Sequence, residues 1–298
     1  MYAPIALFVY DRLDHLKETV EALRKNPEAK SSDLIVFSDA SRSDKNINRV
    51  ERVRDYISTV SGFKSISINH RVSNFGLARS ITEGVSEVLA KYESVIVLED
   101  DIVTSPYFLA FMNESLVRFQ DDERVISVHG YVYSVRQALP EAFFIRGADC
   151  WGWATWRRGW NFYNPDGLAL LNELKRSNLL EAFDFNGTYN YSGMLQAQVE
   201  GRNDSWAIRW YASAFLANKL TLYPGRSLAY NIGNDGSGTH CRGASSIDVE
   251  LSKTRIDLSA VKVEPSEEAY LVFENFFRHN RRSIVKWITS LAGKFKEL

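Results

Sequence analysis

Apolar residues in the first hundred positions follow two different spacings. Short unbroken apolar runs, rich in β-branched residues, occur at 5–10, 34–37 and 95–98, which is typical of strands buried on both faces of a parallel sheet. Between these runs, apolar residues recur every three or four positions over 13–23 and 77–89, as they do on one face of a helix. Strands that alternate with helices predict an α/β domain with a parallel sheet and right-handed crossovers.

The same two spacings continue less regularly through the rest of the chain. Further strands are predicted at 65–69, 125–128, 143–145 and 220–223, and further helices at 50–60, 108–119 and 168–185. An aromatic-rich helix is predicted from Trp206, with Asp204 or Ser205 as its N-cap. From Phe273 onward, apolar residues alternate with arginines and lysines and predict a basic amphipathic helix. Such a helix either packs on the protein body or lies on an anionic membrane surface.

Composition narrows the class of protein. The 298 residues are 45% hydrophobic and 24% charged, which is typical of a soluble globular chain with one large or two small domains. The formal net charge of -1 gives no support to nucleic acid as the main partner. Two cysteines, Cys150 and Cys241, are too few for a disulfide scaffold and fit a reducing compartment. The first apolar run stops at Asp11, so we expect a strand there and not a signal peptide or a membrane span.

Three carboxylates, Glu99, Asp100 and Asp101, follow directly on the apolar run at 95–98. Neighbouring carboxylates in a desolvated place repel one another, so they persist best where a cation or hydrogen-bond donors neutralise them. Open α/β sheets bind ligands outside the carboxyl ends of their strands, where this cluster falls. A divalent cation that carries a phosphate-containing ligand is the simplest occupant. The alternative is an acidic turn in water, followed by a helix cap.

Two later segments also carry candidate binding groups. Four tryptophans, at 151, 153, 156 and 160, lie among glycines, where they either fill the core or offer flat faces on which sugars stack. The loop at 231–241 is rich in glycine and ends in His240 and Cys241. A loop histidine is usually only exposed, but after an acidic cluster it is also a candidate metal ligand.

In this order, the motifs VYDRLDHL, FSDAS, LEDD, WGWATW and GSGTHC resemble those of GT-A glycosyltransferases, which use nucleotide-sugar donors. The resemblance is greatest to the N-acetylglucosaminyltransferase I type and to bacterial family 2-like sugar transferases, and it runs from Pro4 to Cys241. It implies an α/β fold of GT-A type, with a Rossmann-like, mainly parallel central sheet flanked by helices. It also implies a donor-binding half at 1–130, an acceptor-side half at 131–245 and a C-terminal helical extension at 246–298.

The resemblance further implies roles for individual residues. Those expected on the donor nucleotide sugar are Arg12 near the base, Asp39 on the uridine, Glu99 and Asp100 around the ribose, Asn74 and Arg79 at the diphosphate, and Trp153 on the sugar side. Asp101 and His240 are expected to ligate a divalent metal, Mn2+ or Mg2+. Asp204 falls where inverting enzymes of this fold carry the catalytic base, but Trp206 is followed by Ala207 where an acidic residue is expected, so Glu200 is the fallback.

The function implied is inverting, metal-dependent transfer of a hexosyl or N-acetylhexosaminyl group from a UDP-sugar to a glycan or lipid-linked glycan. The setting implied is bacterial surface polysaccharide or lipopolysaccharide synthesis, in the cytoplasm or at the inner membrane face through the basic C-terminal helix. Two alternatives remain. A sugar nucleotidyltransferase would use similar groups, although no glycine- and lysine-bearing phosphate loop lies near the first strand. A catalytically inactive carbohydrate-binding or scaffold protein is the other.

Overall fold

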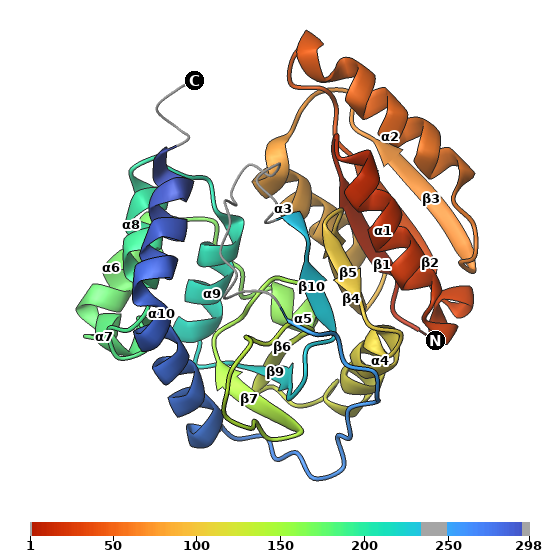
Figure 1. Cartoon of the computed structure of the whole chain (residues 1–298). Coiled ribbons are helices and arrows are strands. Elements are labelled where there is room, and N and C mark those ends of the chain that lie inside the picture. Colours follow the sequence, from red (N-terminus) through yellow and green to blue (C-terminus); the bar gives the residue numbers. More distant parts are fainter. Residues whose placement is uncertain (1, 234–248, 294–298) are drawn as a thin grey trace.

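A central sheet of eight strands runs through the residues that the computed structural model describes, 2–233 and 249–293 (Figure 1). Its strand order is β3-β2-β1-β4-β8-β6-β9-β7. The strands are β1 (Ile5–Val9), β2 (Asp33–Ser38), β3 (Ser65–His70), β4 (Ser94–Glu99), β6 (Val125–His129), β7 (Ala142–Arg146), β8 (Trp153–Trp156) and β9 (Leu220–Pro224). Strands β3, β2, β1 and β4 pair in parallel, as do β6 and β9, whereas β8 and β7 run antiparallel to their neighbours.

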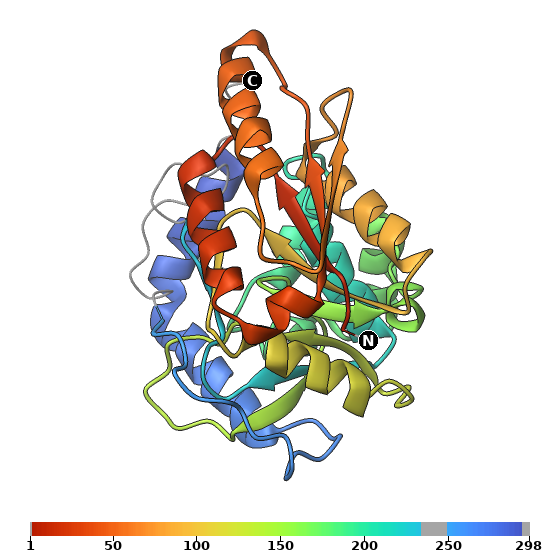
Figure 2. The same ribbon diagram turned by 90° about the vertical axis from the view of Figure 1, so that its right-hand side faces the viewer.

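Helices cover both faces of the parallel half of the sheet. Alternate residues of β1 explain this, because Ile5 and Leu7 belong to one apolar cluster and Ala6 and Phe8 to another. The first cluster includes residues of α1 (Leu13–Arg24) and α2 (Ile47–Thr59), and the second includes residues of α3 (Gly76–Leu89). In Figure 2, α1 and α2 accordingly lie on one side of these strands and α3 on the other.

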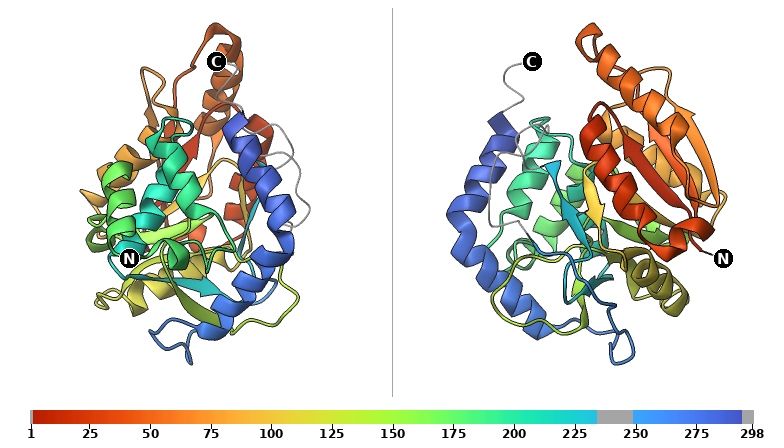
Figure 3. Two further views of the ribbon diagram at one scale, coloured as in Figure 1. Left: turned by 90° about the vertical axis from the view of Figure 1, so that its left-hand side faces the viewer. Right: turned by 45° about the vertical axis from the view of Figure 1, so that its right-hand side comes forward.

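The second half of the chain adds a helical layer beside β7 and β9. This layer consists of α6 (Gly167–Arg176), α7 (Leu180–Phe183), α8 (Tyr191–Val199), α9 (Trp206–Leu216) and α10 (Glu267–Gly293). Two other helices, α4 (Phe108–Arg118) and α5 (Arg157–Trp160), contact β6 and β8. Phe273 and Phe277 of α10 are buried against this layer, so the first part of that helix packs on the body of the protein (Figure 3). The single helix expected over 168–185 is wrong, because the chain breaks into α6 and α7 at Asn178, which has a φ of 53°.

The structure confirms the predicted α/β class, with a mainly parallel central sheet flanked by helices. Strand β8 was not predicted, because its residues were interpreted only as part of an aromatic cluster. A small antiparallel sheet of β5 (Ile102–Thr104) and β10 (Ala229–Asn231) adjoins the carboxyl end of β4. The boundaries at 130 and 245 stay a prediction. Among the described residues, no helix is both long enough and apolar enough to cross a bilayer.

Candidate functional site

The acidic triplet lies at the carboxyl end of β4, in the middle of the sheet. Glu99 is the last residue of β4 and pairs with Phe8 of β1. Asp100 and Asp101 fill the short turn into β5, with only 4% and 6% of their surface exposed. The four residues before Glu99 are all buried, as expected of a strand covered on both faces. The triplet is therefore held near the protein interior and is not a solvated turn.

Arg12, at the start of α1, pairs with two of these carboxylates. Its Nη2 donates to Asp100 Oδ1 and to Asp101 Oδ2, at 2.9 Å in each case. The backbone N–H of Tyr10 donates to the other Asp100 oxygen at 3.2 Å. Burial alone would lower the pKa of Arg12, but the charges of Asp100 and Asp101 outweigh it and raise the pKa well above its usual value. Arg12 therefore stays charged and holds the two aspartates side by side.

One arginine does not balance three carboxylates. Burial, together with the charges of Asp101 and Asp100, raises the pKa of Glu99 to about 8. Burial raises the pKa of Asp100 to about 6, even though Arg12 acts in the opposite direction. Burial therefore opposes the ionisation of these carboxylates, and a further cation would stabilise their charged forms.

Asp101 has one oxygen free for such a cation. Its Oδ2 is paired with Arg12, whereas its buried Oδ1 has no hydrogen-bond partner among the described residues. Gly233, just after β10, lies so close that a Cβ there would be 2.3 Å from Asp101 Oδ2. The N–H of Ile232 also donates to the Asp101 carbonyl at 2.9 Å. The chain after β10 therefore passes directly beside Asp101.

His240, the second predicted metal ligand, lies outside the described residues, as does Cys241. Within residues 2–233 and 249–293, no three histidine, cysteine, aspartate or glutamate side chains are grouped so that they could hold a metal ion. The metal-ligand role of His240 therefore stays a prediction. Only the path of the chain supports this role: Gly233, which lies beside Asp101, is seven residues before His240.

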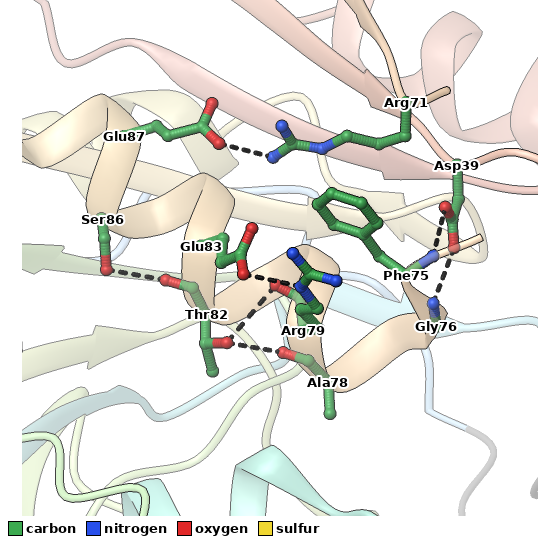
Figure 4. Close-up of polar contacts among 10 residues, drawn as sticks. All are labelled: Asp39, Arg71, Phe75, Gly76, Ala78, Arg79, Thr82, Glu83, Ser86 and Glu87. Carbon is green, nitrogen blue, oxygen red and sulfur yellow. Dashed lines mark hydrogen bonds and ion pairs between the residues drawn. The ribbon is translucent and has the colours of Figure 1, made fainter. Parts of the chain in front are cut away.

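Asp39, at the end of β2, fixes the loop that begins α3 (Figure 4). Its Oδ1 accepts from the N–H groups of Ala40 and Phe75, both at 2.8 Å. Its Oδ2 accepts from the N–H of Gly76 at 2.9 Å and from Asn74 Nδ2 at 3.1 Å. Gly76 has a φ of +72°, which is costly for a residue with a side chain. Both oxygens of Asp39 are thus used to position Asn74 and the first turn of α3.

Arg79 lies on the exposed side of the same loop. Its guanidinium stacks on the Phe75 ring at 3.8 Å from the ring centroid, and its Nε donates to Glu83 at 2.7 Å. Arg71 contacts the same ring at 4.8 Å and pairs with Glu87 at 2.7 Å. Figure 4 shows the two arginines beside the Phe75 ring. Arg79 is 57% exposed, so its charge is accessible at this end of the sheet.

Trp153, expected on the sugar side, lies in the core and is 1% exposed. Its ring contacts those of Trp160, Trp206 and Trp210, with centroids 5.5 to 5.9 Å apart. The pleat of β8 explains this placement, because Trp153 points into the layer between the sheet and α9. Trp151, two residues earlier and partly exposed, is the tryptophan of this motif that lies nearer to the surface.

In the part of the chain that the structure describes, neither predicted base, Asp204 or Glu200, contacts the acidic triplet. Asp204 has 74% of its side chain exposed and pairs with Arg209 at 2.9 Å. Its neighbour Ser205 is the N-cap of α9. Glu200 is 44% exposed and pairs with Arg202, whose hydrogen bonds lower the pKa of Glu200. Both carboxylates are therefore surface groups that are already neutralised.

Sequence reasoning missed Asp149, in the segment between β7 and β8. Asp149 is partly exposed and accepts a hydrogen bond from the Tyr223 hydroxyl at 2.8 Å. Burial raises its pKa to about 6. Next to it, the pKa of the Cys150 thiol is raised far above its usual value by burial and then by Glu99, Asp149 and Asp101. The sequence signal that could have identified Asp149 is its position directly before the Cys-Trp-Gly-Trp motif.

Comparison with known proteins finds low similarity only. No family model matches the sequence, and no curated protein matches it. A mannosyltransferase from Pyrobaculum calidifontis, solved with GDP-Man and Mn2+, is 18% identical over 44% of this chain and 36% of its own, with a TM-score of 0.33. TarS from S. aureus in complex with UDP-GlcNAc is 11% identical over 77% of this chain and 58% of its own, with a TM-score of 0.43.

A further TarS structure is 14% identical over 78% of this chain and 36% of its own, with a TM-score of 0.41. In each case the match covers less than two thirds of the solved chain. Similarity of this degree carries no conclusion about what the present chain binds or does.

Proposed function

We propose that this protein transfers a sugar from a nucleoside-diphosphate donor, a UDP-sugar by the resemblance of its motifs, to a hydroxyl group of a glycan or lipid-linked glycan. The observation that carries the proposal is the buried pair Asp100 and Asp101 at the end of β4, in which Asp101 Oδ1 has no hydrogen-bond partner among the described residues. A buried carboxylate oxygen without a donor costs free energy unless a ligand supplies the missing partner. A cation that carries a diphosphate meets this need.

The chain offers two positive groups and one loop for the donor on this edge of the sheet. Arg12 is fixed between Asp100 and Asp101, and the exposed Arg79 lies at the start of α3. The first turn of α3 offers backbone N–H groups and the positive end of the helix dipole, which favour phosphate groups. Because both Asp39 oxygens hold this loop, we assign Asp39 to positioning the loop that receives the donor.

A divalent cation would be held at Asp101. Asp101 Oδ1 is available to it, and the surrounding carboxylate oxygens are the ligands that Mn2+ and Mg2+ prefer. His240 would complete the ligand set. When bound, the ion would offset the charge that develops on the departing nucleoside diphosphate.

The chain's own groups would carry the other parts of the reaction. Arg12 would add fixed positive charge beside the diphosphate, in a site where burial strengthens electrostatic interactions. A carboxylate must take the proton of the attacking hydroxyl if the transfer is inverting. Asp204, with Glu200 second, is the base implied by resemblance, but each carboxylate would first have to leave its arginine partner.

The acceptor, the donor sugar and the place of the reaction in the cell complete the proposal. By resemblance, the acceptor belongs to bacterial surface polysaccharide or lipopolysaccharide synthesis, and the donor sugar is a hexose or an N-acetylhexosamine. The sequence after Phe273 carries Arg278, Arg281, Arg282 and Lys286 among apolar residues, which supports a peripheral contact with an anionic membrane face.

Product analysis tests the activity. The protein is incubated with UDP- and GDP-sugars, p-nitrophenyl glycosides as acceptors, and Mn2+ or Mg2+, and the released nucleotide and new glycosides are separated by chromatography. We expect nucleoside diphosphate and a glycosylated product with one donor, both lost in Asp101→Asn and retained in Asp55→Asn, which changes an exposed carboxylate on α2. Pyrophosphate release from a nucleoside triphosphate and a sugar phosphate would instead identify a nucleotidyltransferase. Binding without turnover would identify an inactive carbohydrate-binding protein.

A further inference from the structure

We propose that Asp149 is the general base that takes the proton from the acceptor hydroxyl, an inference that rests on the proposed function. Three observations carry it: the path of the segment that holds Asp149, the absence of a cation beside its carboxylate among the described residues, and its single orienting hydrogen bond.

The path of the chain brings Asp149 to the acidic end of β4. Strands β4 and β8 are antiparallel, with Val97 opposite Trp153, so the residues before Trp153 continue past the carboxyl end of β4. Gly152 has a φ of +63° and lies where a Cβ would be 3.0 Å from Ala229 Cβ and 3.4 Å from Ile102 Cγ2. The segment thus packs against the small sheet of β5 and β10, and β5 begins directly after Asp101.

The charges around Cys150 support the same placement. The charges of Glu99, Asp149 and Asp101 all act on its thiol, so these three carboxylates lie around the same side chain. Asp149 is partly exposed, and we place the acceptor hydroxyl at its carboxylate. Asp149 is thus one residue from a side chain that is also close to the carboxylates that we assign to the donor.

Asp149 also differs from the other candidate bases in its partners. Asp204 and Glu200 are each paired with an arginine on the surface. Among the described residues, no lysine, arginine or histidine pairs with Asp149, whose one hydrogen-bond donor is the Tyr223 hydroxyl. A carboxylate that is not neutralised by a cation is the better proton acceptor, and the tyrosine leaves its other oxygen for the substrate.

The acceptor O–H bond breaks and its proton goes to the free oxygen of Asp149, while the acceptor oxygen forms a bond to the anomeric carbon. The bond from that carbon to the phosphate oxygen breaks, and its electron pair leaves with the nucleoside diphosphate. Asp149 returns the proton to water after the product departs.

The surroundings set the pH at which this base works. The charge of Asp149 contributes to the raised pKa values of Cys150 and of five tyrosines, Tyr133, Tyr189, Tyr191, Tyr211 and Tyr223. All have raised pKa values and are neutral near pH 7, so none of them holds Asp149 ionised by charge. Burial raises the pKa of Asp149 to about 6, and the hydrogen bond from Tyr223 acts in the opposite direction. The carboxylate is therefore ionised above about pH 6.

The test compares Asp149→Asn with wild type and with Asp166→Asn. Asp166 caps α6, and asparagine caps helices equally well, so this control changes the same chemical group without changing the fold. Transfer to p-nitrophenyl glycosides and to water is measured with each nucleotide sugar that wild type binds. We expect kcat to fall by about 100-fold or more in Asp149→Asn, with the donor Kd unchanged, and to stay at the wild-type value in the control.

A pH profile separates catalysis from a structural role. In wild type, kcat/KM should fall below about pH 6 as Asp149 takes up a proton. Tyr223→Phe removes the hydrogen bond that lowers this pKa and should move the acid limb to higher pH. An unmoved limb, or a kcat near wild type in Asp149→Asn, overturns the proposal while the transferase function stands. If wild type binds no nucleotide sugar, the proposed function fails, and the base assignment fails with it.

Discussion

His129 should make this protein less stable in acid by an amount that can be worked out. It ends β6, is 2% exposed, and its Nε2 accepts the N–H of Trp151 at 3.1 Å. Burial lowers its pKa to about 3. An unfolded histidine takes up a proton near pH 6.5, so between these two values the unfolded state binds more protons and stability falls as the pH falls. This linkage amounts to about 2 kcal/mol between pH 8 and pH 5.

The assay is urea unfolding at pH 8 and pH 5, in chelator, of wild type and His129→Gln. Glutamine cannot take up the proton but can still accept the Trp151 N–H through its side-chain oxygen. Other groups titrate equally in both proteins, so the wild type should lose about 2 kcal/mol more than the variant over this range. His279→Gln, at an exposed position on α10, should behave as wild type. Equal losses in wild type and His129→Gln would refute the reasoning.

Two further variants test the donor side of the site. Arg12→Met leaves Asp100 and Asp101 without their cation, so it should lower the free energy of unfolding by about 3 kcal/mol in chelator, and Mn2+ should restore more stability to it than to wild type. Asp39→Ala leaves the N–H groups of Phe75 and Gly76 without their acceptor, so it should cost about 2 kcal/mol in urea unfolding and weaken nucleotide binding in calorimetry.

Both variants have matched controls. Arg24→Met breaks an exposed pair with Glu21 and should cost less than about 1 kcal/mol, because exposed ion pairs contribute little. Asp44→Ala removes an exposed carboxylate one loop away from Asp39 and should leave nucleotide binding unchanged. If Arg12→Met is no less stable than Arg24→Met, the charge argument for the site is wrong. If Asp39→Ala binds nucleotide as wild type does, Asp39 does not position the donor loop.

The elements that could be predicted are those whose local pattern agrees with their packing. The run at 95–98 is apolar without a break because β4 is buried on both faces. The sequence therefore predicted that the carboxylates after it lie at the end of a buried strand. By contrast, Trp153 and Trp151 are two residues apart in one motif, and only the pairing of β8 decides that Trp153 enters the core.

In the candidate site too, contacts between residues distant in sequence decide what a local motif leaves open. Asp204 and Asp149 are both acidic residues near aromatic motifs, and nothing local to either distinguishes a base from a surface group. The difference lies in contacts distant in sequence or visible only in the fold: Arg209 neutralises Asp204, whereas Tyr223 orients Asp149 from 74 residues away. Pairing of this kind is set by tertiary structure, so a motif locates the acidic residues but cannot rank them.

The central claim is that the carboxylates at the end of β4 bind a nucleoside diphosphate together with a divalent cation. Calorimetric titration of the full chain with UDP and GDP, each with Mn2+, Mg2+ or chelator, tests it most directly. We predict binding of one nucleotide that requires the metal and is lost in Asp101→Asn. Absence of binding under every condition, or equal binding by Asp101→Asn, would contradict the claim.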